Sequence, residues 1–168
     1  MDSCCSCGWK STLADSISKR IILAVIGQLG APESPPVNIT RSRTIALSDE
    51  CLPEISVYRV EEDPTFIGDP RRPTMAQRHI VLEIAITAEG DDDACEPYHQ
   101  WVVRQMMALP SVGGFYLGGL AKSVSEIKTV WNPDEGSDGS SMTTFLRYRV
   151  EYLTLPGDIT TTIQRPTR

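Results

Sequence analysis

The chain has 168 residues, with a hydrophobic fraction of 40% and a charged fraction of 23%, which fit one globular domain with one core. Its formal net charge of −6 argues against the basic surface that readers of DNA and RNA present. The longest apolar run, residues 21–26, is far shorter than the roughly 20 residues of a membrane-spanning helix, and no secretory signal opens the chain. We therefore expect a product of the cytosol with no membrane partner.

Three of the five cysteines, Cys4, Cys5 and Cys7, lie close together near the N-terminus. A structural zinc site takes four ligands, and the two histidines, His79 and His99, lie far along the chain. We expect free thiols in a flexible tail over residues 1–10, with zinc binding as the alternative.

The first half of the chain predicts one helix followed by strands. Apolar residues recur every four positions over 13–29, Ser11 or Thr12 is placed to cap the start, and Gly30 ends the run. Residues 38–47 are a weak strand candidate and residues 54–61 a better one. The segment 63–73 holds three prolines and a glycine, which predicts a long loop or hairpin tip.

The second half opens on the strongest strand, residues 75–88, in which isoleucine and leucine alternate with Glu83 and its neighbours. The carboxylates of residues 91–93 favour a helix start, and Pro97 fits only in the first turn of that helix. The helix ends before Pro110. Two more strands are expected near 119–131 and 142–154, separated by the turn-rich segment 132–140.

This order of elements predicts the α+β class, with an antiparallel or mixed β-sheet of four to five strands and two main helices packed on one face. Residues 11–156 form the single domain of this prediction. Residues 157–168 are expected to be a C-terminal tail.

The search for chemistry finds no nucleophile elbow, phosphate-binding loop or dinucleotide-binding glycine pattern. The carboxylates of 61–63 and 91–93 fit solvated turn ends or helix caps better than an acid–base pair. Residues 132–143 partly match a calcium loop, but Thr143 stands where the bidentate glutamate is needed. We expect no catalytic residue, no metal and no cofactor.

Three segments, taken in order, carry a resemblance to a known family. They are "LPEISVYRVEED" (52–63), "HIVLEIAITAEGDDDA" (79–94) and "LRYRVEYLTLPGD" (146–158). With the opening amphipathic helix, they make residues 11–156 resemble the tail terminator, or tail-completion, proteins of long-tailed bacteriophages, of the minor tail protein U type.

The resemblance implies a structural virion protein rather than an enzyme. Members of that family form a hexameric ring that caps the head-proximal end of the tail tube, stops tube polymerisation and gives the head connector a docking surface. The implied partners are other copies of the chain, the tail tube protein and the head–tail connector or stopper protein, with DNA passing through the ring lumen without specific binding. The implied location is the head-proximal end of the virion tail, after assembly in the host cytoplasm.

Two alternatives remain open at this point. One is a neck or head-closure protein of the same machinery, which also forms rings. The other is a small hydrolase or ligand-binding α+β domain, which a pocket around His79 or His99 would favour.

Candidate interface residues follow from the strand pattern. Alternation over 145–154 places Arg147, Arg149 and Glu151 on the face opposite the core, together with Glu83. Phe66, Arg71 and Arg72 lie in the segment 63–73 and complete the candidate set. In a monomer the charged face is an ordinary solvated surface, whereas in a ring it pairs with a neighbour or lines the channel.

Overall fold

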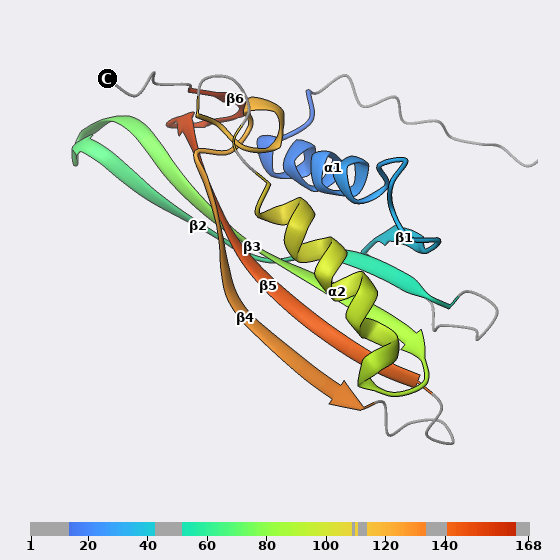
Figure 1. The fold of residues 1–168 in the computed structure, drawn as a ribbon. Helices are drawn as coiled ribbons and strands as arrows, with labels where there is room; N and C mark the ends of the chain where they lie inside the picture. The colour runs from blue at the N-terminus through green and yellow to red at the C-terminus, as the bar shows by residue number, and fades with distance from the viewer. Residues whose placement is uncertain (1–13, 43–51, 109, 111–113, 134–140, 164–168) are drawn as a thin grey trace, which may run out of the picture.

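The computed structural model describes residues 14–42, 52–108, 110, 114–133 and 141–163, except the side chains of Asp92, Asn132 and Pro133. The chain has the predicted α+β fold, in which two helices lie on one face of a curved, mixed sheet (Figure 1). The described sheet has six strands, because a short strand near the C-terminus adds to the four or five that the sequence predicts.

The strand order in the sheet differs from the order in the chain. It runs β1–β2–β3–β5–β4, and β6 pairs with the end of β5. β1 and β2 are parallel, and every other pair is antiparallel. The strand bounds are Asn38–Arg41 for β1, Glu54–Asp69 for β2, Arg72–Glu89 for β3, Ser123–Pro133 for β4, Ser141–Leu155 for β5 and Asp158–Thr162 for β6.

Helix α1 spans Ile17–Leu29 and begins later than the sequence pattern predicts. Ser16, rather than Ser11 or Thr12, is its N-cap, because the Ser16 side chain accepts a hydrogen bond from the Lys19 N–H at 3.3 Å. The extended backbone of Ser16 (φ −61°, ψ 152°) then takes the preceding chain out of the helix. The predicted end at Gly30 is confirmed, since its N–H donates to the Ile26 carbonyl.

Helix α2 spans Asp92–Met106 with Asp91 as N-cap, so Pro97 lies in the helix interior and not in the first turn as predicted. Pro97 has no N–H to donate to the carbonyl four residues earlier. Both Asp93 and Pro97 are exposed, so this missing bond falls on the solvated side of the helix. The opposite side is held by the core, where Trp101 and Val102 are buried, and tertiary packing overrides the local preference.

Of the two alternatives for the segment 63–73, the hairpin tip is confirmed and the long loop is wrong. β2 continues to Asp69 and β3 begins at Arg72, so only Pro70 and Arg71 lie between the two strands. Pro64 is tolerated because β2 is an edge strand here: in the described part of the chain, β1 pairs only with residues 54–57 of β2. The predicted strand 38–47 is also shorter in the structure, as β1 ends at Arg41 and residues 43–47 lie outside the described ranges.

The core lies between the helices and the facing side of β3 and β5. The predicted alternation is confirmed, because the predicted core-facing residues 80, 82, 84 and 86 of β3 and 146, 148, 150 and 152 of β5 are at most 1% exposed. Two hydrogen bonds join the helices: Trp101 Nε1 donates to the Leu29 carbonyl at 2.9 Å, and Gln28 Nε2 donates to the Gln105 carbonyl at 2.6 Å. The central buried residues are Ile17, Ile21, Val25, Ile80, Leu82, Ile84, Ile86, Leu146, Tyr148, Val150 and Tyr152.

Strand β6 lies inside the segment that the sequence assigns to a C-terminal tail. It turns back from β5, with Thr162 opposite Thr154 and Asp158 opposite Leu155, and it lies beside α1 (Figure 1). The folded domain therefore includes the first residues of that segment. The predicted N-terminal tail, residues 1–10, falls outside the described ranges.

Candidate interaction surface

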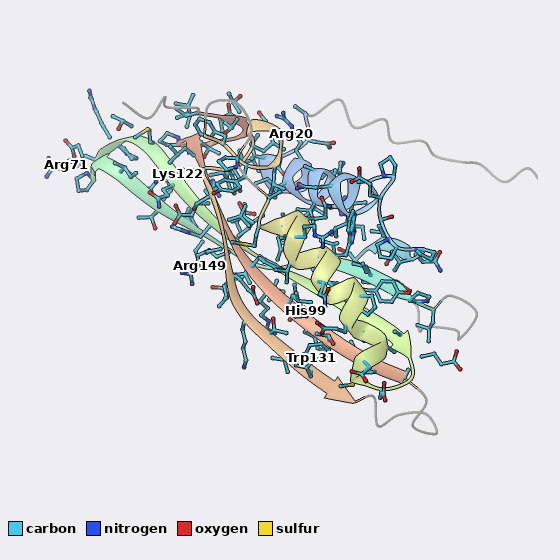
Figure 2. All side chains as sticks on the ribbon, viewed as in Figure 1. Arg20, Arg71, His99, Lys122, Trp131 and Arg149 are labelled. Atoms are coloured by element: carbon cyan, nitrogen blue, oxygen red, sulfur yellow. The ribbon has the colours of Figure 1, made fainter. Side chains whose placement is uncertain are left out.

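The side of the sheet that faces away from the helices, here called the outer face, carries the predicted charged residues. Along β5 the side chains of Leu146, Tyr148 and Val150 are buried, whereas Arg147 and Arg149 are exposed. Figure 2 shows Arg149 pointing away from the helix layer. The predicted facing of this strand is therefore confirmed, and its role as an interface remains a prediction.

Charged side chains on the outer face pair across neighbouring strands. Arg147 Nε lies 2.6 Å from Glu83 Oε2, its register partner on β3. Two outer-face rows further along, Glu151 lies 3.4 Å from His79 Nδ1 and 3.8 Å from Lys122 Nζ. Exposed pairs of this kind contribute about 0–1 kcal/mol each, so they order the surface more than they stabilise the fold.

Arg149 differs from its neighbours on the outer face. Its register partners are Val81 on β3 and Ser125 on β4, and it forms no salt bridge with a described residue. Beyond Val81 lies Glu61, whose pKa is raised by a side-chain hydrogen bond with Asp63, while the positive charge of Arg149 acts in the opposite direction. Arg149 is thus a cation available to a partner molecule.

Exposed apolar side chains lie on the two bulged strands that flank β3 and β5. The register of β2 shifts at Val60 and that of β4 shifts at Ile127. These two side chains are 50% and 45% exposed. Bulges of this kind protect a sheet edge from uncontrolled pairing and present individual side chains outward. Neither position could be predicted from the sequence pattern, because a bulge breaks the alternation of side chains between the two faces.

The β2–β3 hairpin carries the other predicted interface residues at its tip. Phe66 is 57% exposed, and Arg71 and Arg72 are exposed without a salt bridge to any described residue. The Asp69 side chain accepts the Arg71 backbone N–H at 2.8 Å and shapes the turn. Figure 2 shows Arg71 at the far end of the hairpin, away from Arg149. The structure therefore places the predicted set on two separate surfaces.

A polar cluster on the helix side of the sheet was not predicted. Glu62 accepts hydrogen bonds from the Tyr152 hydroxyl at 2.8 Å and from Arg78 Nη1 at 3.2 Å. Burial, followed by the contact with Glu62, raises the pKa of Tyr152, which keeps the hydroxyl a donor. The bulge at Val60 turns Glu62 toward the helix side, and no local sequence pattern signals that change.

The two histidines are not brought together. His79 lies on the outer face beside Glu151, whereas His99 lies on α2 with its ring centroid 5.2 Å from that of Trp131 (Figure 2). Among the residues that the structure describes, no three His, Cys, Asp or Glu side chains are arranged to bind a metal ion. Cys4, Cys5 and Cys7 lie outside those residues, so the alternative of zinc binding stays untested.

Within the described ranges, no helix is both long and apolar enough to cross a membrane. No protein-family description matches the sequence, and neither does any curated protein. One solved structure with a similar arrangement of elements is titled "Virion of native gene transfer agent (GTA) particle". The match covers 81% of this chain and 90% of that chain, with 10% sequence identity and a TM-score of 0.47. Similarity of this degree defines neither a family nor a function for this chain.

Proposed function

We propose that this protein is a structural component of a phage-type virion and acts as a tail terminator. In this proposal six copies form a ring on the head-proximal end of the tail tube, where they stop tube growth and present a docking surface to the head connector. The observation that carries the proposal is the outer face, which the helices leave uncovered and which bears ordered charges beside two exposed apolar bulges.

Such a surface suits contacts between different patches of neighbouring subunits. Closed rings use heterologous interfaces, and charges at these interfaces select register and partner more than they raise affinity. Arg149 supplies a cation without a salt bridge to a described residue. The salt bridge between Glu83 and Arg147 holds these two side chains in a fixed orientation beside it. The net charge of −6 also favours a lumen through which DNA slides without binding.

The ordered resemblance of three segments supports the terminator role over other ring-forming roles. Those segments fall on β2, on β3 with the start of α2, and on β5 with its turn into β6. They therefore span the sheet and one covering helix rather than a single local motif. A neck or head-closure protein remains the second candidate from the sequence. The two roles differ in one outcome: loss of a terminator lengthens the tail tube, whereas loss of a neck protein leaves its length unchanged.

The test combines a double substitution on the outer face with imaging of the purified protein. Arg147→Glu with Arg149→Glu should leave the monomer folded, because both side chains are exposed and the lost pair with Glu83 and the new like-charge contact each cost only about 1 kcal/mol or less. Ring formation in the presence of tail tube protein, seen by electron microscopy, should be lost. The matched control, Arg20→Glu with Arg104→Glu, makes the same charge change on the two helices and should keep the rings.

Two outcomes contradict the proposal. One is a wild-type protein that forms a stable twofold dimer which the tube protein does not alter. The other is a double variant that forms rings as well as the wild type does, which would remove the outer face from the assembly.

A further inference from the structure

The two ends of β3 carry surfaces of opposite charge. At one end is the hairpin tip, defined by Phe66, Ile67, Arg71 and Arg72. At the other end is a cavity of about 240 Å³, here called the acidic pocket, which is lined by Leu52, Pro53, Ala88, Glu89, Ala94 and Tyr98. Asp91 and Asp93 lie at the start of α2, between the lining residues Glu89 and Ala94 in the chain.

The hairpin tip extends beyond the rest of the sheet. β3 pairs with β5 only from Ala76 onward, so the last part of the hairpin is a two-stranded ribbon among the described strands. Phe66 lies opposite Ala76, at the base of this ribbon, and is the most exposed large apolar side chain described, while Ile67 beside it is 36% exposed. A two-stranded ribbon is marginally stable on its own, and burial of an exposed aromatic ring beside it against another surface would stabilise it.

The acidic pocket is lined by several apolar residues and by one carboxylate, that of Glu89. Leu52, Pro53 and Ala94 provide apolar lining, and Tyr98 adds an aromatic ring. Gly90, with a φ of +115°, makes the sharp turn from β3 into α2, which places Glu89 and Asp91 on either side of it. Glu89, Asp91 and Asp93 are exposed and form no salt bridge with a described residue.

The tip and the pocket of one molecule are too far apart to meet. β3 has 18 residues between them. At about 3.3 Å per residue, a strand of this length spans on the order of 55 Å. Figure 1 shows the hairpin turn and the start of α2 at opposite ends of the sheet. Any contact between these surfaces therefore joins two molecules.

We propose that the hairpin tip of one copy docks into the acidic pocket of a second copy. Phe66 enters the cavity, and Arg71 and Arg72 pair with Glu89, Asp91 and Asp93 at its rim. An aromatic anchor surrounded by charge pairs is the usual composition of a small specific contact. Because the two surfaces differ, the contact is heterologous, and its repetition gives a closed ring or an open filament. The inference concerns contacts between copies and holds whether or not the assembly caps a tail tube.

The test is a pair of charge reversals with rescue, followed by sedimentation velocity over a range of protein concentrations. Arg71→Glu with Arg72→Glu reverses the tip, and Glu89→Arg with Asp93→Arg reverses the pocket. Each double variant should raise the dissociation constant for self-association at least about tenfold. The chain that carries all four substitutions should return to within about threefold of the wild type, because the reversed charges again match. Arg20→Glu with Arg104→Glu should leave association unchanged.

A second variant addresses the anchor alone. Phe66→Ser leaves every charge in place and should weaken self-association by a similar factor, while circular dichroism shows an intact fold. The inference is overturned if the reversed variants associate as the wild type does, or if the fourfold variant stays as weak as either double variant. A wild-type chain that remains monomeric at several hundred micromolar also overturns it, since that concentration would populate even a weak specific contact.

Discussion

Val150 and Glu151 are adjacent in the chain but lie on opposite sides of the sheet. The Val150 side chain is fully buried between β5 and the helices. Glu151 lies on the outer face, in contact with His79 and Lys122. The alternation of apolar and charged residues was enough to predict this difference, because side chains along a strand point to the two faces in turn.

Substitution of these two neighbours tests the assignment of faces. Val150→Asp should lower the free energy of unfolding by about 3–5 kcal/mol, because it buries a carboxylate without a partner. Glu151→Ala removes only partly exposed pairs and should lower it by about 0.5 kcal/mol. Urea denaturation of both variants measures the two values. A well-folded Val150→Asp protein beside an unstable Glu151→Ala protein would show that the faces are inverted.

The alternation rule fails for single residues after a bulge. Glu62 would have been assigned to a solvated acidic run with its neighbours, yet it accepts the Tyr152 hydroxyl on the helix side. The bulge at Val60 shifts the register by one residue, which exchanges the two faces for every residue that follows. The position of the bulge cannot be predicted from the sequence pattern, and without it the pattern does not place Glu62 on the helix side.

Among the elements, the β2–β3 hairpin confirms the predicted hairpin tip, but its paired strands reach much further toward the turn than the sequence predicts. Its prolines and glycine are typical of loops, whereas in the structure Pro64 and Pro73 lie in strands. This is possible because the outer edge of β2 beyond Val57 has no described partner strand, and edge strands tolerate proline. Local propensity cannot reveal which strand is at an edge, since that depends on the whole sheet.

The turn into β6 makes a prediction at the same scale. Hydrogen bonds from the Thr160 hydroxyl and backbone N–H lower the pKa of Asp158 from 3.8 to about 2. A carboxyl with a lowered pKa stabilises the folded turn above its unfolded pKa, and this contribution is lost as the pH falls through the folded pKa. The amide chemical shift of Thr160 should therefore titrate with a midpoint near 2.

Asp158→Asn is the matched control for that titration. The amide oxygen of asparagine still accepts a hydrogen bond from Thr160 but has no acidic proton, so the step in chemical shift should disappear while β6 stays formed. A wild-type midpoint near the ordinary value of 3.8 would contradict the hydrogen-bonded turn.

At the scale of the whole molecule, composition and element order were sufficient for the fold class. Two amphipathic helices and several alternating strands bury their apolar sides only as a helix layer on a sheet. The order of strands was not predictable, because the parallel pairing of β1 with β2 and the place of β5 between β3 and β4 depend on long-range contacts. The candidate interface residues were found as exposed charges, but their division between the outer face and the hairpin tip needed the structure.

The central claim is that this protein ends the growth of a tail tube. A polymer with open heterologous interfaces elongates until its end is blocked. The most direct measurement is the length of tails, by electron microscopy, in cells that produce the virion without this protein. The account predicts tubes longer than normal and filled heads that remain unjoined. Tails of normal length joined to heads would contradict it.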